Sequence, residues 1–370
     1  GLLLAACGMD TSKYTDYDKD VVARSKEVQK GPANAPRPSD TSFTQALRCM
    51  DFMFITYGVR DVSVLVEDIS DPTKKVNAGS KDMFISAVSQ MTRRSRAIQL
   101  MAFSATDFTL KEMLEKRAQK LEETPQYAIR GSVSAYDESV IKKQGDVGGL
   151  LGPLMASRAR QGSGSVLGVD LNVINTSTLN LVPGVTSRNS VLLVREGEGA
   201  DGELMFSKFG LNFNFTLVKS EGNAQAMRTL AELAAIELFG KLAKVPYWTC
   251  LGTDDKDPAV QAEITDWWES LAADPESLVA FFQTQMRARG IYKGATNGRV
   301  DEALIQSLEV YQQALGMKST SSLEFEFFRR YLSADHADVQ KKAQAIQKAL
   351  PPVADANAAQ AGGAAAPAGA

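Results

Sequence analysis

The stretch SVLLVREGEGADGELMFSKFGLNFNF, residues 190–215, decides how the chain is interpreted. Two apolar-rich runs flank a glycine-rich, charged turn, and each run has about the 9–11 residues that a tilted strand needs to cross a bilayer. One parity of the second run carries Met205, Phe209, Leu211, Phe213 and Phe215, and the other carries Lys208, Asn212 and Asn214. The alternation alone fits a soluble hairpin with one wet face as well as a membrane hairpin with one lipid face.

Bulk composition narrows the choice of protein class. The chain has 370 residues, of which 44% are hydrophobic and 23% charged, as in ordinary globular proteins. A formal net charge of −3 gives no reason to expect nucleic acid as a partner. No run of about 18 apolar residues is present, so we expect no transmembrane helix.

The residues that carry chemistry are few. His336 is the single histidine, which excludes a Ser-His-Asp or multi-histidine site within one chain, and we expect it on the surface. The three cysteines form no CxxC pair. Cys49 and Cys250 fit either one disulfide in an oxidising compartment or two separate buried thiols. With no paired carboxylate motif and no metal-ligand spacing, we expect neither an enzyme nor a metal or other cofactor.

The start of the chain is typical of a lipoprotein signal. Leu4-Ala5-Ala6-Cys7 resembles the bacterial lipobox, in which small residues precede a cysteine whose thiol carries diacylglycerol. We therefore expect residues 1–6 to be a signal-peptide remnant, Cys7 to be lipidated and sorted to the outer membrane, and 7–42 to be an extended lead. The alternative is a short buried strand that ends in a free cysteine.

Periodicity predicts alternating strands and helices downstream. Strands are predicted at 61–69, 97–103, 127–141, 168–178 and 210–220, and helices at 81–95, 107–123 and 223–243. This order indicates a small α+β layer. The basic clusters RRSR (93–96) and KRAQK (116–120) are predicted to be solvated helix faces. A Gly/Ser-rich stretch at 142–168 interrupts one strand pair, so over-long hairpins are predicted near 137–170 and 186–216.

An ordered set of segments over residues 43–250 resembles the CsgG-like secretion-channel lipoproteins of curli secretion and holdfast attachment. The segments are VSVLVEDI (62–69), SRAIQL (95–100), LKEMLEKR (110–117), IRGSVSAYDESV (129–140), GVDLNVINTSTLNLV (168–182) and LAAIELFGKLAKVPYW (233–248). The resemblance implies an α+β fold with a small periplasmic α/β layer. It also implies two membrane-spanning β-hairpins per protomer, which a homo-oligomeric ring closes into one β-barrel, because no open sheet edge survives in lipid.

The same resemblance assigns roles to residues. The loop after the first strand would constrict the channel through Asp71, Thr73, Lys74, Lys75, Val76 and Asn77. Relatives carry aromatic rings there, and this loop has none, so the passage would be wider or gated by charge. A plain turn is the alternative. The odd-parity residues of the opening stretch, from Met205 to Phe215, would face lipid, and Lys208, Asn212 and Asn214 would line the lumen.

Residues 253–334 lie outside that resemblance and are similar to a peptidoglycan-binding-1 helical repeat. The matching positions include Gln285, Gly290, Tyr292, Gly294, Asn297 and Gly298. The departures are Ile291 for a tyrosine, Asn297 for an aspartate, and Val300-Asp301-Glu302. Peptidoglycan binding is thus one possibility, and a helical module that packs on a partner is the other. Trp267, Trp268 and Phe281 fit a sugar platform or a core. For 335–370 we expect a helix end and a low-complexity tail.

These features together predict an outer-membrane lipoprotein ring that exports or anchors adhesin or amyloid-like fibre subunits. The alternative is a periplasmic scaffold or regulator lipoprotein that binds the cell wall or an envelope machine without conducting.

Overall fold

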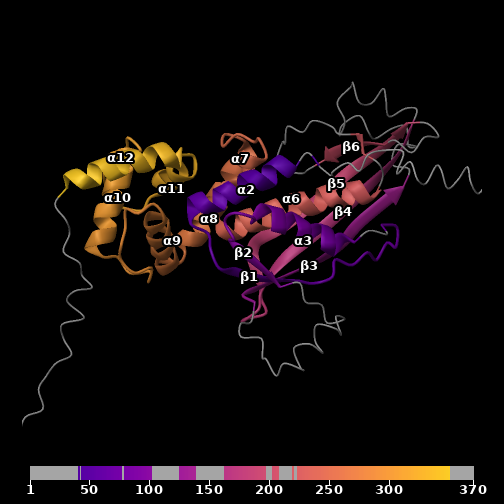
Figure 1. The fold of residues 1–370 in the computed structure, drawn as a ribbon, viewed down its shortest axis with the longest axis horizontal. Helices are drawn as coiled ribbons and strands as arrows, with labels where there is room; N and C mark the ends of the chain where they lie inside the picture. The colour runs from indigo at the N-terminus through magenta and orange to yellow at the C-terminus, as the bar shows by residue number, and fades with distance from the viewer. Residues whose placement is uncertain are drawn as a thin grey trace, which may run out of the picture. The chain divides into compact units, whose positions relative to one another are not determined.

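A computed structural model describes residues 41, 43–76, 79–101, 125–138, 162–196, 202–207, 219–220 and 223–350. Helices and strands are mixed, and the described strands form one sheet in the order β2-β1-β3-β4-β5-β6-β7 (Figure 1). The predicted α+β class is therefore confirmed.

Alternating helices and strands build the first part of the sheet. The elements are α2 (Thr44–Tyr57), β1 (Val62–Val66), α3 (Ser80–Met91), β2 (Ile98–Met101) and β3 (Tyr127–Glu138). β1 lies between β2 and β3 and runs parallel to both, as the helical connection through α3 requires for β1 and β2. The strands predicted at 61–69, 97–103 and 127–141 are confirmed over the residues that the structure describes.

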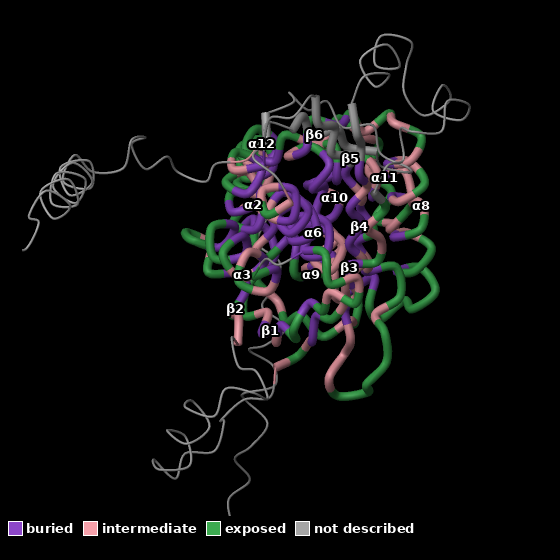
Figure 2. The backbone as a smooth tube through the Cα atoms, turned by 90° about the vertical axis from the view of Figure 1, so that its right-hand side faces the viewer, coloured by how far each residue is buried: buried purple, intermediate pink, exposed green. Residues whose placement is uncertain are grey.

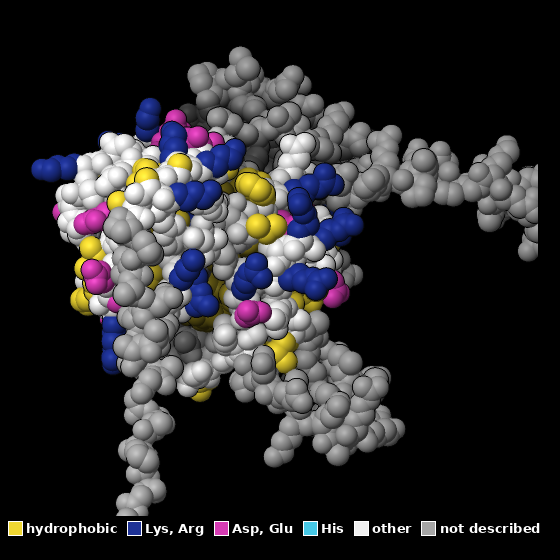
Figure 3. Space-filling model, turned by 60° about the vertical axis from the view of Figure 1, so that its left-hand side comes forward, with side chains coloured by type: hydrophobic (Ala, Val, Ile, Leu, Met, Phe, Trp, Pro, Cys, Tyr) yellow, Lys and Arg dark blue, Asp and Glu magenta, His cyan; other side chains and the backbone are white. Residues whose placement is uncertain are grey.

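The helix predicted at 81–95 ends early, at Met91, and residues 92–95 form turns. The carboxylate of Asp51 on α2 accepts hydrogen bonds from the backbone N–H groups of Arg94 (2.9 Å) and Ser95 (2.8 Å), which holds the turn. The RRSR cluster is exposed as expected, but its placement on a helix face was wrong. On the face seen in Figure 3, Lys and Arg side chains are spread over the surface with Asp and Glu among them.

From β3 onward the sheet is antiparallel. β4 (Gly162–Asn175), β5 (Leu181–Glu196), β6 (Gly202–Ser207) and β7 (Lys219–Ser220) each pair with the strand before them. The register pairs Glu138 with Ser165 across β3–β4 and Arg195 with Gly202 across β5–β6. Strands occupy the parts of the two predicted hairpins that the structure describes, and the strand predicted at 168–178 is confirmed by β4. Of the strand predicted at 210–220, only Lys219 and Ser220 lie within the described residues.

Helix α6 (Asn223–Ala243) is the centre of the core, and its prediction at 223–243 is confirmed. Nearly every residue from Ala226 to Gly240 is buried, so the helix has no wet face. It packs on β5 and β4 on one side and on α3 and α2 on the other. Figure 2 shows the buried backbone concentrated around α6. The ladder of β4 faces this core with Leu167, Val169, Leu171 and Val173.

Short helices make up the rest of the described chain. They are α7 (Tyr247–Cys250), α8 (Pro258–Ala272), α9 (Pro275–Ala288), α10 (Glu302–Ala314), α11 (Phe325–Leu332) and α12 (His336–Ala349). α12 packs on α10, so the helical region continues past the boundary expected at 334. No helix within the described ranges combines the length and apolarity needed to cross a membrane.

The aromatic residues proposed as a sugar platform are core residues. Trp267 is 7% exposed and stacks near Trp248 with ring centroids 5.3 Å apart. Trp268 and Phe281 are partly buried against Phe328, with centroids 5.8 and 5.9 Å away. The packing alternative is confirmed for these three side chains.

Cys49 on α2 and Cys250 on α7 form a disulfide, which resolves the two alternatives left open by the sequence. The bond joins residues 201 apart in the chain, and their Cα atoms lie 5.5 Å apart. It ties the first helix of the α/β part to the segment that leaves α6.

Several residues with predicted roles lie outside the described ranges. They are Cys7, Asn77, Lys208, Phe209, Leu211, Asn212, Phe213, Asn214 and Phe215, together with the helix predicted at 107–123 and the KRAQK cluster. Their assignments stay predictions.

Reduction of the disulfide should destabilise the fold, because closing a loop of this length removes conformational entropy from the unfolded chain. We expect the Cys49→Ser/Cys250→Ser protein to lose about 2–5 kcal/mol of unfolding free energy in guanidinium titrations. The wild-type protein should show the same loss in dithiothreitol, whereas the double variant should not respond to it. Equal stability with and without reductant in the wild-type protein would contradict the assignment.

Candidate functional site

The loop after β1 is a folded turn. One carboxylate oxygen of Asp71 accepts hydrogen bonds from the Thr73 N–H (2.9 Å) and hydroxyl, and the other accepts one from the Val76 N–H at 2.8 Å. Val76 is 6% exposed and anchors the far side of the loop in the core. Partial burial raises the pKa of Asp71, but these hydrogen bonds outweigh it and hold the pKa below its ordinary value.

Lys74 and Lys75 are the exposed cations of this loop. Lys74 has a φ of 55°, a left-handed conformation that non-glycine residues seldom adopt. Of the six residues predicted for a constriction, the structure gathers Asp71, Thr73 and Val76 into the turn. It leaves Lys74 and Lys75 at the surface, while Asn77 lies outside the described residues.

A second candidate is the loop between α9 and α10. Gln283 is fully buried beneath it. Its side-chain oxygen accepts a hydrogen bond from the Gly298 N–H at 2.9 Å, and its side-chain nitrogen donates to the Arg299 carbonyl at 2.7 Å. One side chain therefore replaces the hydrogen bonds that this irregular backbone lacks.

Tyr292 fixes the same loop from inside. Its hydroxyl donates to Asp301 Oδ2 at 2.8 Å, while Asp301 Oδ1 accepts the Leu304 N–H and so caps α10. Burial and the Asp301 carboxylate raise the pKa of Tyr292 to about 12. A Cβ at residue 294 would lie 2.2 Å from the Tyr292 hydroxyl, which explains Gly294. Gly298 has a φ of +73°, and a Cβ there would lie 2.3 Å from Glu276.

Among the residues predicted for glycan binding, Tyr292, Gly294 and Gly298 thus shape this loop. Tyr292 is 1% exposed and Gln285 is 4% exposed, and the Gln285 Oε1 accepts hydrogen bonds from the Tyr331 hydroxyl (2.7 Å) and from Arg289 (3.1 Å). Gly290, Gly294 and Gly298 supply turn geometry, and Asn297 is exposed. The side chains of Gln285 and Tyr292 offer little surface to a sugar, so their assignment as direct glycan contacts is not supported by their positions.

His336 lies at the joint between the α/β part and the helical region, and its expected surface position was wrong. It is 6% exposed, with Nε2 2.7 Å from the hydroxyl of Tyr57 on α2 and Nδ1 2.6 Å from the hydroxyl of Tyr311 on α10. Burial, with a smaller contribution from Arg289, lowers the pKa of His336 to about 2. The imidazole is therefore neutral wherever the protein is folded and near neutral pH.

Arg289 is buried beside this histidine, with 1% of its surface exposed. Its Nε lies 3.4 Å from His336 Nδ1, and its Nη1 donates to the Gln285 carbonyl at 2.9 Å. The guanidinium carbon lies 4.7 Å from the Tyr331 ring centroid and 5.2 Å from that of Tyr57. Nη2 is buried and has no hydrogen-bond partner among the residues that the structure describes. A buried cation without a carboxylate partner is costly, so this arrangement needs an explanation.

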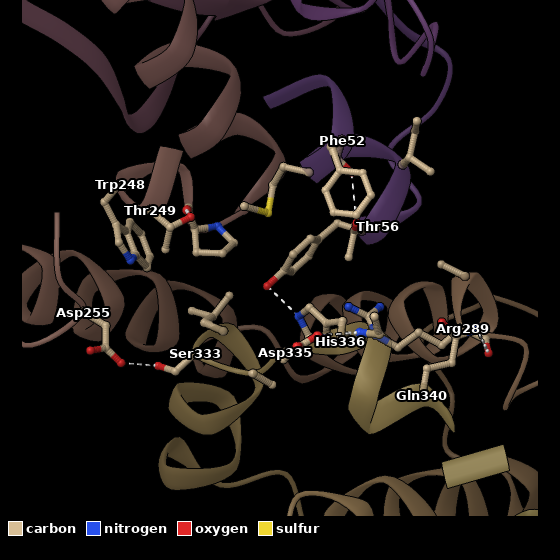
Figure 4. A pocket seen from close by; sticks show the side chains of 18 of the residues that line it. Phe52, Thr56, Trp248, Thr249, Asp255, Arg289, Ser333, Asp335, His336 and Gln340 are labelled. Atoms are coloured by element: carbon tan, nitrogen blue, oxygen red, sulfur yellow. Dashed lines mark hydrogen bonds between the residues drawn. The ribbon is translucent and has the colours of Figure 1, made fainter. Parts of the chain in front are cut away.

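A cavity of about 790 Å³ opens above this cluster (Figure 4). Its walls come from α2, α7, the end of α9 and the start of α12, and they include Arg289 and His336. Phe52 and Ile55, on α2, are 62% and 45% exposed at its edge. Cavities of this size between structural units are where proteins commonly bind small ligands.

Sequence reasoning missed Arg289 and the role of His336, because their partners Tyr57, Tyr311 and Tyr331 come from separate helices. The one available signal was the uniqueness of His336. Among the residues that the structure describes, no cluster of His, Cys, Asp and Glu could hold a metal ion.

Comparisons with known proteins give little. No protein-family model matches the chain, and no curated protein matches it. Among solved structures, a PelC dodecamer from Paraburkholderia phytofirmans is similar at 14% identity over 48% of this chain and 90% of that chain, with a TM-score of 0.23. A likeness at this level carries no argument about function or assembly.

Replacing Gln283 with Leu should destabilise the helical region, since the Gly298 N–H and the Arg299 carbonyl would lose their partner. We expect a loss of about 2–3 kcal/mol in unfolding free energy. The matched control Thr284→Leu changes an exposed neighbour on α9 and should stay within about 0.5 kcal/mol of the wild type. Equal effects of the two substitutions would contradict the role given to Gln283.

His336 should make stability depend on pH. The pKa of His336 in the folded protein lies below the value of about 6.5 for an unfolded histidine. Below pH 6.5 the histidine therefore binds a proton in the unfolded chain but not in the folded chain. The free energy of unfolding should therefore fall by up to about 1.4 kcal/mol per unit as pH decreases below 6.5.

The His336→Gln variant removes this titration and keeps a polar side chain at the joint. Denaturant titrations between pH 7 and 4.5 give the unfolding free energy as a function of pH. This free energy should fall less steeply with decreasing pH in the variant, because unfolding takes up close to one proton fewer. Parallel slopes in the two proteins would contradict a buried, neutral His336.

Proposed function

We propose that the protein is an outer-membrane lipoprotein, anchored through Cys7, whose copies form a ring-shaped secretion channel or anchor for surface adhesin or amyloid-like fibre subunits. The observation that carries the proposal is the run of antiparallel strands β3, β4, β5 and β6, which continues beyond the start of α6. On this proposal the α/β layer and the helical region are periplasmic, and the protein catalyses no reaction.

The level at which α6 begins can be read from one contact. Asn223, the first residue of α6, donates to the Tyr136 hydroxyl on β3 at 3.0 Å. Residues paired side by side across the strands form a row, and the row through Tyr136 contains Leu167, Val191 and Phe206. Further rows lie beyond it, including the one in which Ser165 pairs with Glu138 and Leu193, and Leu193 pairs with Leu204. The sheet therefore extends past the helix that covers its core.

The sequence pattern of β5 changes at this level. On alternate residues of β5, the sequence places Thr186, Arg188 and Ser190 along the part of the strand that α6 covers. Leu192 and Val194 continue the same alternation past the start of α6. Leu192 pairs with Met205, the first residue of the series predicted to face lipid, and with Val166 on β4. A change from polar to apolar residues on one parity, at the point where a strand leaves its helix, is what a strand entering lipid requires.

Assembly follows from the edges of the sheet. β2 and β7 end the described sheet, and each offers one unpaired side. An edge that enters lipid costs several kcal/mol for each unsatisfied backbone group, so the hairpins of one chain need those of other copies to close a barrel. The Cys49–Cys250 disulfide also fits the oxidising periplasm.

We assign the proposed charge-gated constriction of the channel to the loop at 70–76. It leaves the sheet at Ser70, which bridges Ser132 of β3, on the way toward the hairpin end of that strand. The Asp71 carboxylate is engaged within the turn, and the loop exposes the cationic side chains of Lys74 and Lys75. A ring of copies would multiply these cations around the passage, which favours acidic clients.

Gel electrophoresis in SDS with and without boiling tests the ring. We expect a high-mass band that collapses to monomer only on boiling, and discrete conductance steps when the extracted protein is added to a planar bilayer. A lipidated protein that is monomeric and non-conducting would overturn the proposal and leave the scaffold or regulator alternative.

Paired substitutions test which parity faces lipid. Phe213→Asp should block membrane assembly, because an acidic group on the lipid face costs up to a few kcal/mol in each copy. Asn212→Asp places the same charge one residue away, on the predicted lumen side, and should assemble normally. Phe209→Asp and Lys208→Glu should repeat this contrast. Equal behaviour within each pair would contradict the facing assignment.

A further inference from the structure

We propose that the cavity between α2, α7 and α12 binds the C-terminal end of a peptide, with the free carboxylate paired to Arg289. This site is independent of the membrane hairpins, and nothing in the proposed channel function requires it.

The buried guanidinium is the first argument. Arg289 is 1% exposed, and within the described part of the chain its Nη2 has no hydrogen-bond partner and the guanidinium contacts aromatic rings in place of a carboxylate. The tyrosine faces attract a cation but do not accept its remaining hydrogen bonds as oxygen does. A carboxylate is the ligand that a guanidinium prefers, because it accepts charge-assisted hydrogen bonds in a matching planar geometry.

Among the described residues that line this cavity, Arg289 is the one cation. The neutral His336 beside it adds no charge. One buried cation therefore calls for one carboxylate and not for a dianion such as a phosphate monoester.

The rim has the opposite charge. Asp254, Asp255 and Asp335 line the same cavity. Asp255 accepts the Ser333 hydroxyl at 2.6 Å, and Asp335 accepts the Ala337 N–H at 3.1 Å as the cap of α12. In Figure 4, Asp255 and Arg289 lie at opposite ends of the cavity, with Asp335 and His336 between them. A simple anion would be repelled at this rim, whereas a ligand with a cationic group behind its carboxylate would match both ends.

Apolar surface completes the match. Phe52 and Ile55 are three residues apart on α2, so they share one face of the helix, and both are exposed beside the cavity. Together with Pro246 and Leu332 they give apolar walls for side chains near the peptide end. The volume of about 790 Å³ lies within the range of pockets that hold ligands of this size.

The test uses full-length protein and a panel of acetylated tetrapeptides that carry lysine first and Leu, Phe, Val or Ala last, each as the free acid and as the C-terminal amide. His336 supplies a direct readout because it is the only histidine and lies 3.4 Å from Arg289 Nε. At least one acid should shift the imidazole NMR signals saturably and give a calorimetric Kd. Its amide should bind at least about tenfold more weakly, a difference of about 1.4 kcal/mol.

Matched variants separate the site from general charge. Arg289→Gln should abolish acid binding, whereas Arg287→Gln removes an exposed cation from the same helix and should leave it unchanged. Replacing the peptide's lysine with glutamine should weaken binding by severalfold. Failure of every acid to bind at up to about 5 mM, or equal binding of acid and amide, would overturn the proposal. The acid–amide comparison on wild-type protein decides the matter even if Arg289→Gln does not fold.

Discussion

The fold depends on one constraint, the burial of helix α6 on all sides. Nearly all of its residues from 226 to 240 are inaccessible, so it must be covered by the sheet on one side and by α2 and α3 on the other. Its alanines and Gly240 allow close approach, and a Cβ at 240 would lie 2.5 Å from Tyr247. Two carboxylates are buried with it. Glu237 accepts hydrogen bonds from Ser187 (2.8 Å) and Asn189 (2.7 Å) on β5, and Glu232 accepts one from Thr41.

Those two glutamates fix the rotation of α6 about its axis, which its otherwise apolar surface would leave undefined. A helix that is apolar all round could rotate about its axis with little loss of apolar contact. A buried carboxylate must meet its donors, so Glu237 fixes the face that lies on β5. Lys241 reinforces this choice by donating to the Thr186 carbonyl at 2.9 Å, one strand residue from Ser187. The position of β5 and its register follow from these polar contacts as much as from apolar packing.

Local pattern was sufficient for the elements and insufficient for the contacts between them. Period-two and helical spacing predicted β1, β4 and α6 because each element carries its own signal over many residues. The helix end at Met91 was missed, since the turn after it is held by Asp51, more than 40 residues away. His336 was misplaced for the same reason. Its hydrogen-bond partner Tyr57 is 279 residues distant, and no periodicity around the histidine records that contact. The Cys49–Cys250 bond likewise depends on α2 and α7 meeting across the core.

The part of the sheet that α6 covers also sets the strand register of the part that extends beyond α6. Shifting a strand by one residue exchanges its two faces, and such a slip is prevented only where one face is buried. β4 and β5 are buried against α6 through Leu167, Leu171 and Val191, so their register is fixed there. The same strands continue beyond α6 without a break, which means that Leu192 and Met205 inherit a register set by the core. On the proposed assembly, the part of a hairpin beyond α6 would enter lipid while the part packed on α6 keeps its contacts. The core would then set the strand register of the membrane part. Ring closure would have to supply hydrogen-bond partners only for the backbone groups of the edge strands.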